Sequence, residues 1–193
     1  MVFSDLFFLF VFLPAFLLCY LLATWIDRQW LSSESLRSNK AKNLILVCFS
    51  LIFYAWGEPV YVFLMLFCVF VNYLVGLGID RSEQHRKAVL VIGLILNIAI
   101  IGTFKYLGFL AQCLCDIGIP VAKPNIALPI GISFYTFQSI SYLIDVYRRE
   151  SPVQRRFPDL LLYISMFPQL IAGPIVRYGT VADEIHHRHV SHL

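Results

Sequence analysis

The sequence predicts an all-α fold, a polytopic membrane bundle of about six membrane segments, one or two of them short or re-entrant. The first observation is composition: 59% of the 193 residues are hydrophobic and 14% are charged, against about 45–50% and about 25% in an average soluble domain. A chain of this size in water could not bury so much apolar surface. The second observation is a series of apolar runs near the ~20 residues that cross a bilayer. We therefore expect the lipid bilayer as its surroundings, and the small net charge of +3 excludes a nucleic-acid partner.

Four apolar runs form the first part of the bundle. The run at 6–26 is interrupted only by Pro14, and no Lys or Arg precedes it, so it is a retained span rather than a signal peptide. The run at 44–56 is short for a span. Those at 60–79 and 88–104 are close to the ordinary length. A short amphipathic helix and a loop are expected to follow, over 106–127.

Basic residues predict the orientation of these segments. They gather in the loops 27–43 and 80–87 and are missing from the turn at 57–59. Lys and Arg favour the cytoplasmic side of short loops. Both basic loops are therefore predicted to be cytoplasmic, and the N-terminus extracytoplasmic.

The segment 128–147 differs from the other runs because it carries a polar stripe. Its members recur at spacings of three, four and three, which places them on one face of a helix: Tyr135, Gln138, Tyr142 and Asp145. Lipid cannot satisfy such groups. The stripe either lines a substrate passage or forms hydrogen bonds between helices. For Asp145, a local ion pair with Arg148 is the expected role.

A second unusual segment covers 159–174. Pro168 interrupts its apolar run and Gly173 ends it, which predicts a broken or re-entrant helix kinked at the proline. Gln169 lies beside the kink and is a candidate for lining a cavity. Arg177 follows closely, and either holds an anionic or polar group at the mouth of that cavity or extends to the membrane interface.

Residue patterns for metal binding or catalysis are weak. The five cysteines form no zinc or disulfide pattern. The histidines of 186–192 lack a complementary cluster of carboxylates or cysteines, so no metal site is predicted. The sequence contains no nucleophile elbow, phosphate loop or paired-carboxylate motif.

Four segments carry a resemblance to a known family. They read YAWGEP at 54–59, LPIGISFYTFQ at 128–138, IDVYR at 144–148 and FPQLIAGPIVRY at 167–178. In this order they resemble the membrane-bound O-acyltransferase family, and most closely its bacterial alginate O-acetyltransferase branch.

The resemblance implies a multi-pass enzyme of the bacterial inner membrane. Such an enzyme brings a cytoplasmic acyl donor, acetyl-CoA or another acyl carrier, and an extracytoplasmic acceptor toward a buried histidine. The donor is a substrate, and no bound cofactor is implied. Expected partners are extracytoplasmic acetyltransferase proteins and a polysaccharide such as alginate.

Family members are more than twice as long as this chain, and their key histidine belongs to the part that would follow residue 193, so the resemblance implies no catalytic residue within 1–193. The chain is therefore expected to be an incomplete N-terminal portion, forming one integral membrane domain over 1–193. Two other functions remain open from the residues alone. One is a transporter or channel, although no internal repeat is visible, and the other is a non-catalytic membrane fragment.

Overall fold

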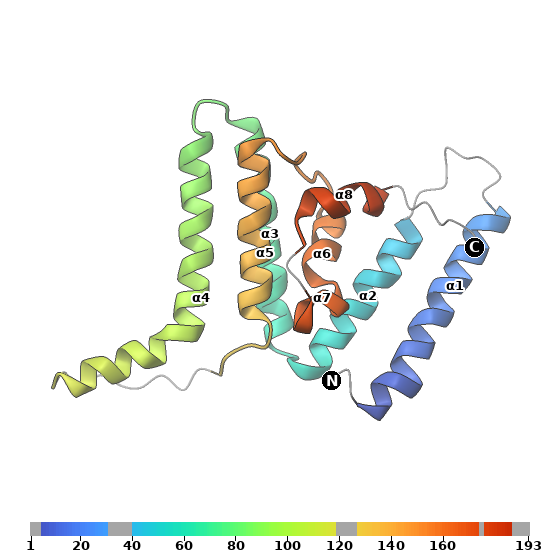
Figure 1. Cartoon of the computed structure of the whole chain (residues 1–193), viewed down its shortest axis with the longest axis horizontal. Helices are drawn as coiled ribbons and strands as arrows, with labels where there is room; N and C mark the ends of the chain where they lie inside the picture. Colours follow the sequence, from blue (N-terminus) through green and yellow to red (C-terminus); the bar gives the residue numbers. More distant parts are fainter. Residues whose placement is uncertain (1–4, 31–39, 119–126, 174–175, 187–193) are drawn as a thin grey trace.

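A computed structural model describes residues 5–30, 40–118, 127–173 and 176–186, and these residues contain helices and no strand, as predicted. Figure 1 shows their arrangement. The helices are α1 (Leu13–Trp30), α2 (Lys40–Gly57), α3 (Tyr61–Arg81), α4 (Arg86–Asp116), α5 (Ile132–Arg148), α6 (Phe157–Ser165), α7 (Phe167–Ala172) and α8 (Tyr178–His186), with a π-helical turn (Phe8–Phe12) before α1.

Among the described residues, three stretches are long and apolar enough to cross a membrane: Phe8–Trp25, Tyr61–Arg81 and Arg86–Asp116. The stretch Ala41–Gly57 in α2 is a shorter apolar helix. Large apolar side chains on these helices point outward, and Phe63 is 71% exposed. Because water would penalise such a surface and lipid would not, the chain is a multi-pass membrane protein.

Pro14 does not divide the first span. The Leu13 N–H donates to the carbonyl of Phe8, five residues back, so the helix widens into a π turn directly before the proline. A proline ring crowds the carbonyl four residues before it, and a wider turn is a known way to insert such a residue in a continuous helix.

Several predicted boundaries are wrong. α2 begins at Lys40, before the apolar run at 44–56, because polar residues can form the first turn of a helix. α4 continues through Lys105 to Asp116, so the separate helix expected within 106–127 is the end of α4. This end turns away from the bundle (Figure 1). Residues 119–126 lie outside the described residues.

α5 also begins later than the run at 128–147 suggested. Gly131 has φ +76°, a left-handed conformation that ends the preceding extended chain and starts the helix at Ile132. The place is crowded as well, since a Cβ on Gly131 would lie 3.2 Å from the carbonyl oxygen of Leu170 in α7.

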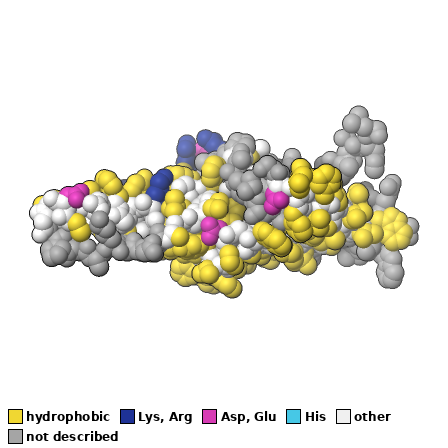
Figure 2. All heavy atoms as spheres, turned by 90° about the horizontal axis from the view of Figure 1, so that it is seen from below, with side chains coloured by type: hydrophobic (Ala, Val, Ile, Leu, Met, Phe, Trp, Pro, Cys, Tyr) yellow, Lys and Arg dark blue, Asp and Glu magenta, His cyan; other side chains and the backbone are white. Residues whose placement is uncertain are grey.

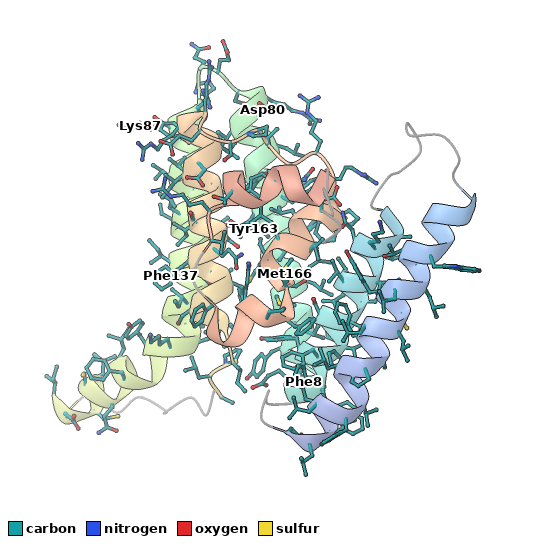
Figure 3. The ribbon with its side chains drawn as sticks, turned by 45° about the vertical axis from the view of Figure 1, so that its right-hand side comes forward. Phe8, Asp80, Lys87, Phe137, Tyr163 and Met166 are labelled. Carbon is teal, nitrogen blue, oxygen red and sulfur yellow. The ribbon has the colours of Figure 1, made fainter. Side chains whose placement is uncertain are left out.

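The helix ends follow the alternation that the basic loops predicted. Figure 1 places the C-terminal ends of α1, α3 and α5 and the N-terminal ends of α2 and α4 at one end of the bundle. Asp80 and Lys87 mark this end and Phe8 the other (Figure 3). Viewed from that other end, the described side chains are mostly hydrophobic or uncharged (Figure 2).

The core consists of two packed groups. The first includes side chains of α2 to α8, and within it reciprocal amide hydrogen bonds of 3.1 and 2.7 Å between Asn72 and Asn97 join α3 to α4. The second is an aromatic group on the π turn, α2 and α7, made by Phe8, Phe12, Phe53 and Phe167. Phe12 and Phe167 meet edge to face with ring centroids 5.7 Å apart. This contact fixes α7 against the first span.

Candidate functional site

The break between α6 and α7 lies at Met166, which has φ −53° and ψ 114° and therefore cannot continue the helix. The predicted broken helix is confirmed, but its position differs. Pro168 lies in the first turn of α7, where a missing N–H leaves no hydrogen bond unmade. The proline thus starts the second helix rather than kinking a continuous one.

The break separates two backbone groups that would pair in a continuous helix. In a continuous α-helix, the Phe167 N–H would donate to the carbonyl of Tyr163. Instead, the Gln138 amide of α5 donates to that carbonyl at 2.8 Å. The Phe167 N–H donates to Ser50 Oγ of α2 at 3.3 Å. Side chains from two neighbouring helices therefore replace one lost backbone hydrogen bond.

Further contacts hold the segments on either side of the break. Gln138 Nε2 lies 3.5 Å from Gln169 Oε1 in α7, a long hydrogen bond. The Tyr163 hydroxyl donates to the carbonyl of Val176 at 2.7 Å, which brings the chain before α8 against α6. Tyr163 and Met166 lie between α5 and α2 (Figure 3).

Three tyrosines and a glutamine extend this site toward α8. The Gln154 N–H donates to Tyr142 Oη at 3.1 Å, and Gln154 Nε2 donates to Tyr178 Oη at 2.9 Å. The Tyr178 ring meets the rings of Tyr142 and Tyr163 edge to face, each with centroids 5.2 Å apart. We call the following set the polar cluster: Gln138, Tyr142, Gln154, Tyr163, Gln169 and Tyr178.

Sequence reasoning found half of the polar cluster. Gln154 lies in a charged connecting segment, and Tyr163 reads as one more aromatic residue of an apolar run, so neither showed a distinctive pattern. Tyr178 is the last residue of the fourth family-like segment, at 167–178. Its place in that segment was the one sequence feature that pointed to Tyr178.

The predicted stripe is present on α5. All four of its members are buried, whereas Phe137 on the other side of the helix is 51% exposed. Gln138 and Tyr142 have the protein partners given above. Within the described residues, Tyr135 Oη and Asp145 Oδ2 are buried without a hydrogen-bond partner.

The predicted ion pair between Asp145 and Arg148 is wrong. Arg148 instead contacts Glu150, with 2.9 Å between Nη2 and Oε1. Arg149 has φ 61°, which turns the chain back at the end of α5 and brings Glu150 beside Arg148. Arg177 is exposed.

The described residues contain no group of three or more His, Cys, Asp or Glu side chains able to hold a metal ion. No disulfide joins any of the five cysteines, all of which lie in the described residues. His85 is exposed at the N-terminus of α4. The histidine-rich tail at 187–193 lies outside the described residues.

Comparison with known proteins gives several relatives. Over 97% of its length the chain is 38% identical to the probable alginate O-acetylase AlgI of Pseudomonas aeruginosa, and 37% identical to that of Pseudomonas syringae pv. tomato, covering 35% of each. Over its whole length it is 29% identical to the peptidoglycan O-acetyltransferase of Helicobacter pylori, covering 40% of that protein. No family profile and no solved structure matches the chain.

The chain spans about a third of the length of the curated alginate O-acetylases that it matches. The similarity covers 97% of the chain. The resemblance carried by those segments is thereby confirmed, and the chain is homologous to the alginate O-acetylase branch of the membrane-bound O-acyltransferase family.

Proposed function

We propose that this chain is part of a membrane-bound O-acyltransferase that transfers an acetyl group to an extracytoplasmic, cell-surface polysaccharide such as alginate. The observation that carries the proposal is 38% identity over 97% of the chain to a probable alginate O-acetylase. The peptidoglycan O-acetyltransferase relative is named for the same type of acyl transfer, to another cell-surface polymer.

The proposed reaction runs across the bacterial inner membrane. Acetyl-CoA or another acyl carrier donates the acetyl group on the cytoplasmic side, and extracytoplasmic partner proteins pass it to the polysaccharide. The basic end of the bundle faces the cytoplasm and the N-terminus faces outward, as the distribution of Lys and Arg supports. Residues 1–193 belong to one integral membrane domain.

Within this domain, the polar cluster would hold together the helices that form the wall of the substrate passage. Gln138 and Tyr142 are buried and hold α5 in place through their hydrogen bonds, Tyr135 is buried beside them, and Gln169 is half-buried. Asp145 has a buried carboxylate oxygen to which the structure assigns no partner among the described residues. Asp145 and the exposed Arg177 are the two residues best placed to contact a polar substrate.

We assign no catalytic role to a residue of this chain. The acyl transfer needs a base or acyl carrier that titrates near neutral pH, for which histidine is the usual side chain. His85 is exposed in the basic loop and does not fit that role. In this proposal the catalytic histidine comes from a part of the enzyme that the chain does not contain.

The proposal is tested in the source organism. Deleting the gene should lower the O-acetyl content of the extracellular polysaccharide, and restoring it should return that content to the wild-type level. Polysaccharide and peptidoglycan are analysed separately, so that the acceptor is identified. Unchanged O-acetylation of both polymers in the deletion strain contradicts the proposal.

A transporter or channel is less well supported. Two residues at the centre of the stripe form hydrogen bonds with the protein itself. Gln138 donates one to the carbonyl of Tyr163, and Tyr142 accepts one from the Gln154 N–H. These are the interhelical contacts expected of packing rather than of a wet pathway.

A further inference from the structure

An open cleft lies at the basic end of the bundle, outside the polar cluster. Its volume is about 490 Å³, and its lining comes from the end of α3, the α3–α4 loop, the start of α4 and the chain after α5. Four of the lining side chains are charged: Asp80, Glu83, Arg86 and Arg149.

The position of the cleft relative to the membrane follows from the helices that carry it. α3 and α4 are long and apolar enough to cross a bilayer, and the cleft lies where α3 ends and α4 begins. A helix of that kind passes from hydrocarbon to headgroups at its charged end. The cleft therefore lies at the depth of phospholipid headgroups.

The charges of the cleft balance one another. Two carboxylates and two guanidinium groups line the same hollow, so a strongly anionic ligand would meet repulsion as well as attraction. Ser151, Pro152 and Val153 complete the wall with small or uncharged groups. This arrangement fits a ligand that itself carries one positive and one negative charge.

The two arginines differ in how firmly they are held. Arg86 Nη2 donates to the carbonyls of Val146 and Tyr147, at 3.1 and 3.0 Å, which fixes its guanidinium at the C-terminal end of α5. Its Nε is buried and has no hydrogen-bond partner among the described residues. Arg149 forms a 3.2 Å ion pair with Glu83, but both side chains are mostly exposed. Such a pair is weak and can open for a ligand.

A smaller hollow of about 220 Å³ shares Asp80 with the cleft. Two of its lining residues, Leu77 and Tyr73, lie one and two turns of α3 closer to the middle of the membrane. The next turn of the same helix carries the half-exposed Phe70. The two hollows thus meet at Asp80, and the smaller one extends along α3 toward the middle of the membrane.

The other two residues that line the smaller hollow are Arg81 and Arg155, and Arg155 forms a 3.6 Å ion pair with Asp80. Both side chains of this pair are largely exposed, so the pair is weak and can open for a ligand.

We propose that the cleft binds the headgroup of a zwitterionic phospholipid with a primary ammonium group, such as phosphatidylethanolamine. Arg86 and Arg149 hold the phosphate, while Asp80 and Glu83 accept hydrogen bonds from the ammonium. The glycerol and the start of an acyl chain follow the smaller hollow along α3. This lipid site does not depend on the proposed acetyl transfer.

The test uses the full chain, purified in detergent and freed of native lipid. Dioctanoyl phosphatidylethanolamine, phosphatidylcholine and phosphatidylglycerol are titrated separately, and bound lipid is counted by native mass spectrometry. Phosphatidylethanolamine should bind about five-fold or more tightly than the other two. Phosphatidylcholine has the same charges but no ammonium N–H, and phosphatidylglycerol lacks the cation.

Asp80→Asn and Arg149→Gln should each reduce this preference to the level of phosphatidylcholine. Arg148→Gln is the matched control, because Arg148 is the neighbouring exposed arginine, pairs with Glu150 and does not line the cleft. Circular dichroism confirms that each variant retains its helix content.

Equal binding of the three lipids overturns the proposal, as do Asp80→Asn and Arg149→Gln variants that behave like Arg148→Gln. Soluble phosphoethanolamine binding as tightly as the lipid overturns the assignment to a lipid.

Discussion

The side-chain amide of Gln138 replaces the backbone hydrogen bond that is lost where α6 ends and α7 begins. A leucine there keeps the volume but removes the donor, so the buried carbonyl of Tyr163 loses its partner. We expect Gln138→Leu to lower the free energy of unfolding by about 1–3 kcal/mol, measured by thermal unfolding in detergent.

Gln112→Leu is the control for this substitution, because Gln112 is exposed and bonds only to Asp116 on its own helix. The control should stay within about 0.5 kcal/mol of the parent chain. Equal stability of the two variants would show that Gln138 does not support the break.

Ser50 supports the same break from the opposite side. Ser50→Ala removes the acceptor of the Phe167 N–H, and we expect a loss of about 1 kcal/mol in unfolding free energy. Thr103→Ala removes a hydroxyl that bonds within its own exposed helix turn, and should be close to neutral. Chemical denaturation in detergent compares the two, and a Ser50→Ala variant as stable as Thr103→Ala would contradict this account.

Part of the polar cluster could be predicted from the sequence. The 3-4-3 spacing placed Gln138 on a buried face, since polar groups in a membrane helix avoid lipid. Its acceptor could not be predicted. Tyr163 lies 25 residues further along, and its carbonyl is free only because the chain breaks at Met166.

Among the elements, α3, α4 and α5 approach closely where glycines replace larger side chains. A Cβ on Gly93 would lie 2.6 Å from Val75 Cγ1 and 2.9 Å from Leu143 Cδ1. Small residues at such contacts let membrane helices pack by shape rather than by hydrophobicity.

The prediction for these elements compares two glycines of α4. Gly93→Ala should destabilise the chain by about 1–3 kcal/mol, because the interface has no room for a methyl group. Gly102→Ala should be neutral or stabilise by up to about 1 kcal/mol, since a Cβ there meets nothing within 4 Å. Thermal unfolding in detergent measures both, and equal effects would mean that the helices do not meet closely at Gly93.

The sequence predicted correctly that the elements are helices, but it predicted the residues at which they begin and end less well. Apolar runs identified α3 because it is apolar throughout, whereas the end of α4 was missed because a single charge, Lys105, does not stop a helix. The sequence also did not predict that a new helix, α7, starts just before Pro168. Proline disfavours the interior of a helix but favours its first turn, and only the structure distinguishes the two positions for Pro168.

Across the whole molecule, the alternation of helix ends makes the topology testable. In a chain whose five native cysteines are replaced by serine, Val60→Cys lies in the exposed α2–α3 turn and Gln84→Cys in the exposed α3–α4 loop. A membrane-impermeant maleimide on intact spheroplasts should label Val60→Cys, and should label Gln84→Cys only after permeabilisation. The reverse pattern would invert the proposed orientation.

The alternation of the helix ends could be predicted from sequence, because basic loops and a turn without Lys or Arg separate the apolar runs. The side of the membrane on which each end lies stays a prediction from the distribution of Lys and Arg. The packing of α6, α7 and α8 against α5 was not, since it depends on long-range contacts such as the Tyr178 ring between Tyr142 and Tyr163. These contacts join segments that are separated by charged chain, and no periodicity connects them.

The central claim is acetyl transfer, and it is tested most directly with membrane vesicles from the source organism. Labelled acetyl-CoA is supplied with the purified cell-surface polysaccharide, and label in the polymer is counted for wild-type, deletion and restored strains. The account predicts label in the wild-type and restored samples and its loss in the deletion sample. Undiminished labelling in the deletion sample would contradict it.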